Sequence, residues 1–376
     1  MDFLLDGIRS ITLPQVLMYI IGGVLIFLAI KKELEPALLL PMGFGAILVN
    51  IPMSGVLSWG DQSNTAGIIE WLFELGIEAS EALPLLLFIG IGAMIDFGPL
   101  LSNPKLIFFG AAAQVGIFIT IILATILGFE FKDAASIGII GAADGPTSIL
   151  VANTLGSEYF GAISVAAYSY MALVPIIQPL AIKLSTTKKE RMIRMEYNPS
   201  GVSKSTKIIF PIAVTLIAGL IAPQSISLVG FLMFGNLIKE CGVLDSLSET
   251  ASKSLANLVT LLLGITISFS MKAESFIRVE TLMIMGLGLF AFVIDTIGGV
   301  FFAKFINLFS KKKINPMIGA AGISAFPMSA RVIQKLGLEA DPENHLLMHA
   351  IGANVAGQVA SVVAGGIILS LVPFMI

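Results

Sequence analysis

Residues 140–148 read Ile-Gly-Ala-Ala-Asp-Gly-Pro-Thr-Ser and place one carboxylate, Asp144, beside two helix-breaking residues in a largely apolar chain. A charged side chain in the middle of a bilayer costs about 3 kcal/mol on insertion scales, so it normally faces protein or water. Gly145 and Pro146 interrupt a helix and free backbone groups that need partners. Membrane proteins commonly bind cations at such interruptions. The segment therefore predicts a cation site within a membrane.

The composition of the chain indicates a polytopic membrane protein. Of its 376 residues, 56% are hydrophobic and 12% are charged, whereas an ordinary soluble domain has about 25% charged residues. A net charge of −3 gives no basis for nucleic-acid binding, and a single cysteine excludes an internal disulfide framework. Apolar stretches long enough to cross a bilayer, or nearly so, lie near residues 14–30, 36–52, 82–97, 105–128, 158–183, 208–222, 225–239, 255–271, 280–306 and 344–374.

The two halves of the sequence share short motifs in the same order. The tetrapeptide IGAA occurs at 140–143 and again at 318–321, and LGSE at 155–158 resembles LGLE at 336–339. Each match is weak alone, but their common order favours an internal duplication. We expect a first repeat over 1–188, a linker over 189–207 and a second repeat over 208–376. Each repeat carries a Gly/Pro-broken segment before its last span, at 134–155 and at 314–336.

The distribution of positive charge predicts the orientation of these repeats. Lysine and arginine gather at 31–32, 183–207 and 311–313, whereas residues 33–104 contain neither and carry several acidic side chains. Positive loops are typical of the cytoplasmic side, which places the N-terminus outside and the central linker in the cytoplasm. Each repeat then crosses the membrane an odd number of times. We therefore expect an all-α polytopic membrane protein with two inverted repeats, 10–11 transmembrane helices and two discontinuous or re-entrant elements.

Inverted repeats bring their broken elements together near the middle of the membrane. We therefore expect Asp144 to lie close to the segment 315–324. Na+ prefers oxygen ligands, and the sequence has no Cys/His cluster that would favour a transition metal. The oxygen-bearing side chains of the two elements are Asp144, Thr147, Ser148, Asn153, Asn315, Ser324 and Ser329.

Five motifs are long enough to compare with known families. The first half contains GAADGPT at 141–147 and AAYSYMALVP at 166–175. The second half contains NPMIGAAGISA at 315–325, PMSAR at 327–331, and LMHA followed by NVAG within 347–357. Together they resemble the β subunits of sodium-pumping biotin-dependent decarboxylases, which act on oxaloacetate, methylmalonyl-CoA, glutaconyl-CoA or malonate.

This resemblance implies a membrane subunit that decarboxylates carboxybiotin and couples the reaction to Na+ export with consumption of a proton. The chain length favours a glutaconyl-CoA or methylmalonyl-CoA system over an oxaloacetate system. The implied partners are a biotin carrier protein, a carboxyltransferase α subunit and small membrane γ or δ subunits. The resemblance also implies a homo-oligomer in the inner membrane of a bacterium or archaeon.

The resemblance also assigns roles to individual residues. Asp144 would bind Na+ and exchange it for the proton, Tyr170 would lie near the ion path, and Arg331 would lie at the cytoplasmic carboxybiotin end. These three residues are the implied catalytic set. The implied sodium ligands are Asp144, Thr147, Asn315, Gly319, Ser324 and Asn354.

Ordinary structural roles stay open for these residues. Asp144 could be a hydrogen-bonded structural carboxylate, Tyr170 could pack at the membrane interface, and Arg331 could extend to that interface. Asparagine and serine side chains could cap helix ends. Asp295 is a second intramembrane carboxylate by pattern, which could act directly, pair with a lysine or contact another subunit. His349 could be an interior histidine or a proton relay.

Two other classes of function stay open as well. A stand-alone Na+-coupled secondary transporter of an organic anion would share the architecture but would need no biotinylated partner. A structural membrane anchor is a further alternative. The presence of Asp144 argues against an anchor, because an anchor gains nothing from a carboxylate in the membrane.

Overall fold

The computed structural model describes residues 6–57, 67–79, 81–196 and 201–375. Within these ranges every regular element is helical and no strand occurs. The first half contains α1 (Asp6–Arg9), α2 (Leu13–Lys32), α3 (Pro36–Val49), α4 (Ile68–Phe73), α5 (Ala82–Met94), α6 (Gly98–Ser102), α7 (Ile107–Ala112), α8 (Val115–Ile126), α9 (Phe131–Gly138), α10 (Gly145–Thr154), α11 (Phe160–Ser185) and α12 (Lys188–Arg191). The second half contains α13 (Lys204–Ile221), α14 (Ile226–Glu240), α15 (Asp245–Glu249), α16 (Ala256–Ile267), α17 (Ala273–Phe276), α18 (Val279–Phe309), α19 (Met317–Ala320), α20 (Met328–Ala340) and α21 (Leu347–Leu371).

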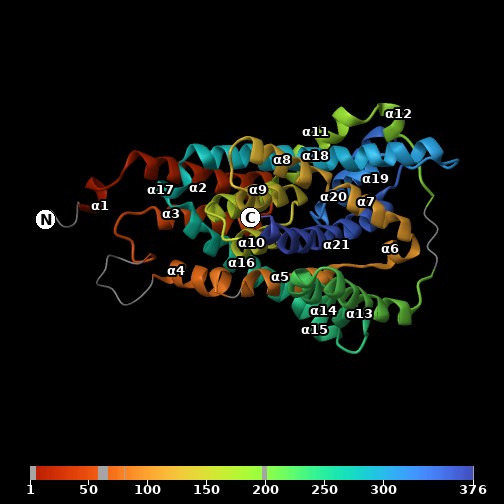
Figure 1. Ribbon diagram of the computed structural model, residues 1–376, viewed down its shortest axis with the longest axis horizontal. Coiled ribbons are helices and arrows are strands. Elements are labelled where there is room, and N and C mark those ends of the chain that lie inside the picture. Colours follow the sequence, from red (N-terminus) through yellow and green to blue (C-terminus); the bar gives the residue numbers. More distant parts are fainter. Residues whose placement is uncertain (1–5, 58–66, 80, 197–200, 376) are drawn as a thin grey trace.

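Short tighter or wider helical turns extend several of these helices. They are η2 (Glu74–Glu78), η3 (Pro104–Leu106), η4 (Ile139–Ala142), η5 (Pro223–Ser225), η6 (Thr250–Leu255), η7 (Ser268–Met271) and η8 (Val372–Phe374). Figure 1 shows an elongated molecule in which most of the long helices run along its longest axis.

The helices confirm a polytopic membrane protein. Among the described residues, seven helices are long and apolar enough to cross a membrane, or eight if the bent pair Ile68–Glu78 and Ala82–Met94 forms one span. The seven are Leu13–Lys32, Pro104–Ile126, Phe160–Ser185, Lys204–Ile221, Asp245–Met271, Val279–Phe309 and Leu347–Phe374.

The ten apolar stretches of the sequence all fall on helices, but not all of these helices have the expected length. Three of the stretches correspond to α3, α5 and α14, which have 14, 13 and 15 residues. At 1.5 Å per residue, α3 is about 21 Å long, whereas the hydrocarbon core is about 30 Å thick. Length alone thus supports seven or eight spans, and 10–11 crossings stay a prediction.

The helices pack into two groups that share one interface. The first group, which we call the panel bundle, contains α2, α3, α5, α13, α14 and α16, with α3 packed on α16 and α5 on α14. The second group, which we call the core bundle, contains α7–α11 and α18–α21, with α11 packed on α18 and α7 on α21. The two bundles meet where α10 contacts α5 and α21 contacts α14.

Corresponding helices of the two halves make corresponding contacts. Within the panel bundle, α2 packs on α3 as α13 packs on α14. Within the core bundle, α10 packs on α11 as α20 packs on α21, and α8 packs on α9 as α18 packs on α19. A duplicated chain is expected to give this pattern. The inverted orientation of the halves and the boundaries of the repeats stay predictions.

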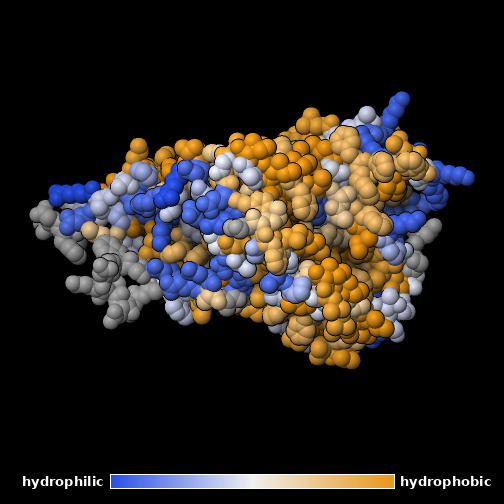
Figure 2. Space-filling model, viewed as in Figure 1, coloured by the Kyte–Doolittle hydropathy of each residue, from blue (hydrophilic) through white to orange (hydrophobic). Residues whose placement is uncertain are grey.

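The surface separates apolar from polar side chains. Figure 2 shows hydrophobic residues over the lower right of the molecule, where α13–α15 lie in Figure 1, and hydrophilic residues toward the left part and at the right edge. Large apolar side chains of α13, such as Leu216 and Leu220, are exposed. An apolar face of this kind suits contact with lipid chains.

Candidate functional site

The first broken element is interrupted where the sequence predicts it. The helix α9 continues into η4, Ala143 then adopts a left-handed backbone (φ 54°), and α10 begins after Asp144. Pro146 lies in the first turn of α10, where its missing N–H is not needed. Asp144 is the N-cap of α10 and accepts a hydrogen bond from the backbone N–H of Thr147 at 3.4 Å. The turn therefore fixes the position of the carboxylate.

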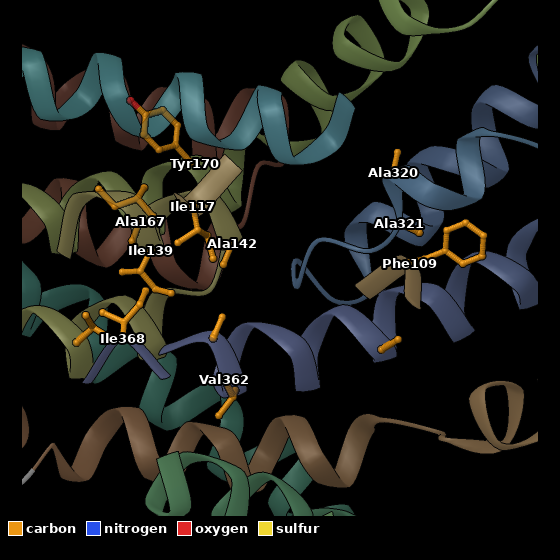
Figure 3. Packing of buried hydrophobic residues seen from close by; sticks show 14 of the residues in the cluster. Phe109, Ile117, Ile139, Ala142, Ala167, Tyr170, Ala320, Ala321, Val362 and Ile368 are labelled. Carbon is orange, nitrogen blue, oxygen red and sulfur yellow. The ribbon is translucent and has the colours of Figure 1, made fainter. Parts of the chain in front are cut away.

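The second broken element meets the first at a single carbonyl group. The one-turn helix α19 is followed by a non-helical stretch up to the start of α20. Within it, the backbone N–H and the hydroxyl of Ser324 both donate hydrogen bonds to the carbonyl oxygen of Ala142, at 3.0 and 2.6 Å. Figure 3 shows Ala142 on one element and Ala320 and Ala321 on the other, with the α21 helix that carries Val362 below them. The expected proximity of the two elements is confirmed.

The carboxylate of Asp144 is surrounded by neutral donors. Its Oδ2 atom accepts hydrogen bonds from the hydroxyls of Thr147 and Ser361, each at 2.8 Å, and from the Gln358 amide at 3.4 Å. The residue is 3% exposed. Across the described ranges, no lysine, arginine or histidine forms an ion pair with it. An ionised carboxylate buried in this way lacks a counter-charge, and burial of an uncompensated charge is costly.

Asp144 lines a cavity of about 290 Å³. Hydrophobic side chains such as Leu87, Ile91 and Met171 form much of its wall, and Tyr168, Ser324 and Gln358 add polar groups. The cavity adjoins a second hollow of about 450 Å³, which we call the vestibule. The two hollows share Glu35, Met328 and Arg331, and the vestibule is further lined by Glu33, Lys183, Lys335 and Glu339. An acidic side chain, Glu35, and a basic one, Arg331, thus lie where the two hollows meet.

Four of the predicted site residues lie at or next to Asp144 or along its cavity. Thr147 hydrogen-bonds the carboxylate, and Ser324 and Arg331 line the cavity. Asn354 donates a hydrogen bond to the carbonyl oxygen of Ile323 at 2.6 Å, beside Ser324. The Oδ1 atom of Asn354 is buried and has no hydrogen-bond partner among the described residues. It is therefore an unused oxygen close to the crossing of the two elements.

Three other predicted residues have different surroundings and do not line the cavity. The amide of Asn315 donates to the carbonyl oxygens of Arg191 and Ile193 at 2.9 and 2.8 Å, so it fastens the central linker. The backbone of Gly319 faces that of Gly299 so closely that a Cβ atom at either position would clash. Because neither glycine has a Cβ atom, the backbones of α18 and α19 can come into direct contact.

Tyr170 is the third of these residues. Its hydroxyl donates a hydrogen bond to the carbonyl oxygen of Met285 on α18, and the ring packs beside Gly288. Tyr168 lines the cavity instead, and its buried hydroxyl has no hydrogen-bond partner in the part of the chain that the structure describes. Side chains two residues apart on an α-helix point in nearly opposite directions, about 160° apart. Therefore the two tyrosines of α11 cannot face the same cavity.

Three side chains that contact Asp144 or line its cavity, Gln358, Ser361 and Glu35, were not predicted from the sequence. Gln358 and Ser361 lie on α21, four and seven residues after Asn354, and thus on the same face of that helix. This spacing could have identified them once Asn354 was a candidate. Glu35 could not be found in the same way, because an acidic residue between two apolar stretches reads as an ordinary interfacial charge.

Asp295, on α18, is another buried carboxylate of the core bundle. Its Oδ1 atom accepts a hydrogen bond from the backbone N–H of Gly116 at 2.5 Å, at the start of α8. The Oδ2 atom lies against the backbone of Gly141 in η4 and accepts no hydrogen bond from any residue that the structure describes. In the described part of the chain Asp295 makes no ion pair with a lysine. Its contacts are those of a residue that joins α18 to α8.

Comparison with known proteins gives consistent matches over nearly the whole chain. Residues 14–372 match the family described as the Na+-transporting oxaloacetate decarboxylase beta subunit. The methylmalonyl-CoA decarboxylase subunit beta of Propionigenium modestum is 47% identical over 97% of this chain and 96% of its own length. The glutaconyl-CoA decarboxylase subunit beta of Acidaminococcus fermentans is 47% identical, with 98% and 96% covered. The oxaloacetate decarboxylase beta chain of Haemophilus ducreyi is 44% identical, with 98% of both chains covered.

Proposed function

This chain belongs to the family of Na+-transporting oxaloacetate decarboxylase β subunits, and from that premise we propose that it removes CO2 from carboxybiotin at the cavity described above. It is a multi-pass membrane subunit of a Na+-transporting decarboxylase complex. No observation favours the alternative of a stand-alone transporter. The observation that carries the site assignment is that Asp144 and Arg331 line one cavity.

Asp144 is the carboxylate at which Na+ and a proton replace each other. Because the described residues that contact it are all neutral, Asp144 needs either a bound cation or a proton. Hydroxyl oxygens of Thr147 and Ser361 lie beside it and could turn toward a cation, together with backbone carbonyls that the break in the helix frees. Ser324 and Asn354 add oxygen atoms at the crossing of the two elements.

Arg331 binds the carboxylate of carboxybiotin at the junction of cavity and vestibule. Loss of CO2 is easiest when the carboxylate has left water and a proton can reach the departing ureido nitrogen. The hydrophobic wall of the cavity supplies the first condition, and acidic groups along it supply the second. Each charge moved against a potential of about 100 mV costs about 2.3 kcal/mol. The reaction must therefore depend on Na+ occupancy, or the pump would leak.

The roles of the remaining predicted residues follow from their contacts. Tyr170 is a positioning residue that holds α11 against α18 through Met285. Asn315 and Gly319 position the second broken element, Asn315 through the linker and Gly319 through close packing on α18. They support the sodium site without being its nearest groups.

The vestibule faces the cytoplasm, because lysines and an arginine line it and positive residues are retained on that side. A biotin carrier protein brings carboxybiotin to this opening, and a carboxyltransferase α subunit and small membrane γ or δ subunits complete the complex. The acid that first donates the carboxyl group never enters this chain. The subunit lies in the inner membrane with its N-terminus outside, its two halves are inverted repeats, and it self-associates.

The test uses the purified subunit in proteoliposomes that are supplied with free carboxybiotin, with and without Na+. We expect decarboxylation to require Na+ and 22Na movement to accompany it. The assay needs no carrier protein, because free carboxybiotin takes the place of the carboxylated carrier. Sodium movement that is indifferent to carboxybiotin would instead establish a secondary transporter with the same architecture.

A further inference from the structure

Glu35 occupies the junction between the cavity and the vestibule. It precedes α3 and has a left-handed backbone (φ 37°, ψ 61°), while the following Pro36 begins the helix. Its side chain makes no capping hydrogen bond to α3 and lines both hollows. The residue is half-buried, whereas nearby Glu33 is exposed and lines only the vestibule. The two glutamates therefore differ in access to the cavity that contains Asp144.

Two opposing influences act on the protonation state of the Glu35 carboxyl group. Burial raises the pKa of Glu35, and the positive charge of Arg331 partly opposes that rise. Desolvation disfavours the charged form of a carboxyl group, while a nearby cation favours it. The titratable and charged side chains that line the same two hollows come from the α2–α3 connection and from α10, α11 and α20, and they are Glu33, Asp144, Tyr168, Lys183, Arg331, Lys335 and Glu339.

We propose that Glu35 is the acid that protonates the ureido nitrogen of carboxybiotin as CO2 departs. This inference rests on the proposed function and extends it to a residue beyond the predicted catalytic set. Arg331 would hold the substrate carboxylate at the junction, and Glu35 lines that same junction. Placing the acid beside the group that binds the carboxylate brings it within reach of the scissile bond.

The chemical step balances without another reactant. The bond between the carboxyl carbon and the ureido nitrogen breaks, and its electron pair stays on the nitrogen. The nitrogen takes the proton of Glu35, so biotin and neutral CO2 leave and Glu35 becomes a carboxylate. The new carboxylate then neutralises Arg331, which has just lost its anionic partner.

The same arrangement connects the proton to sodium binding. An ionised Glu35 would repel the incoming substrate carboxylate, so substrate binding favours the protonated form. Asp144 lines the same cavity, and a proton that Na+ displaces from Asp144 can therefore reach Glu35 without leaving it. Binding of Na+ at Asp144 would in this way restore the proton of Glu35. Decarboxylation would then depend on Na+, as is required of a pump that does not release CO2 without moving Na+.

The substitution Glu35→Gln tests the proposal, with Glu33→Gln as the matched control. General acids contribute about 100- to 10,000-fold to a rate, so we expect kcat for free carboxybiotin to fall at least ~100-fold in E35Q. KM should stay the same or fall, because the amide cannot repel the substrate. In the active protein kcat should be high at low pH and fall as Glu35 loses its proton, and E35Q should lack this fall. E33Q should keep the wild-type kcat and pH profile.

A second variant separates an acid from a structural residue. In Glu35→Ala, added acetate or formate should restore part of kcat, since a small carboxylic acid can enter through the vestibule. The dependence of 22Na binding on Na+ concentration should be unchanged in E35Q. The proposal is overturned if E35Q keeps the wild-type kcat and pH profile, or if E35A shows no rescue while folded. Failure of the wild-type protein to decarboxylate carboxybiotin would instead reject the proposed function itself.

Discussion

Two of the buried carboxylates of the core bundle, Asp144 and Asp295, have surroundings that differ in kind. Side chains of α10 and α21 contact Asp144, and a cavity lies beside it. Asp295 instead accepts a hydrogen bond from a backbone N–H at the start of α8, and neither the cavity nor the vestibule includes it. Hydroxyl groups can rotate to accept a cation, whereas backbone amides cannot. Burial is thus shared by both carboxylates, but of the two Asp144 is the one with hydroxyl neighbours that can turn toward a cation.

The largest effect should follow from Asp144→Asn. The amide keeps the shape of the side chain but has no negative charge to balance Na+ and cannot carry the transported proton. We expect both carboxybiotin decarboxylation and 22Na transport to fall ~1,000-fold or more, as when a central electrostatic group is removed from an active site. Both are measured in proteoliposomes, with thermal unfolding in detergent as the folding control. Decarboxylation at the normal rate by this variant would disprove the idea of a shared site.

Asp295→Ala should affect stability rather than sodium dependence. The substitution removes the acceptor of a buried backbone N–H, and an unsatisfied buried donor costs about 1–3 kcal/mol. We expect a lower Tm in detergent and an unchanged half-saturating Na+ concentration in the protein that remains folded. If the Na+ dependence shifted as strongly as in Asp144→Asn, the contrast between the two carboxylates would be lost.

A smaller effect is expected for Ser361→Ala, which removes one hydroxyl from Asp144. The hydroxyl donates at 2.8 Å, and one such group is worth about 1 kcal/mol. We predict that the half-saturating Na+ concentration rises ~5-fold, while kcat at saturating Na+ is retained. Ser370→Ala is a matched control on the same helix, because that hydroxyl bonds only to the carbonyl oxygen of Gly366. Equal effects of the two variants would contradict the role of Ser361.

Much of the fold could be predicted because the signals are local. A Gly-Pro pair after Asp144 breaks a helix wherever it occurs, and apolar stretches become helices in a membrane. The number of spans was harder to predict, since α3 and α14 are shorter than a bilayer is thick. An apolar stretch does not reveal where its helix will end: the stretch at 36–52 begins with α3 at Pro36, but α3 ends at Val49.

The site could be predicted only in part, because tertiary contacts complete it. Asp144 and Thr147 lie in one turn, so their proximity follows from sequence spacing. Ser361 is 217 residues away from Asp144 and is brought to it by the packing of α21 on α10. Which of the two tyrosines lines the cavity, Tyr168 or Tyr170, depends on how α11 is rotated about its axis, and no sequence motif specifies that rotation. For the same reason the role of Glu35 emerges only from the shape of the hollows.

The central claim is that Na+ binds at Asp144 and not at Asp295. The most direct measurement is reaction of the complete protein with a hydrophobic carbodiimide, with and without Na+, followed by mapping of the modified carboxyl groups by mass spectrometry. Carbodiimides react with protonated carboxyl groups, so we predict that Asp144 is modified and that Na+ protects it in a concentration-dependent manner. Asp295 should show no protection by Na+. Modification of Asp144 that is indifferent to Na+, or protection that appears at Asp295 instead, would contradict the account.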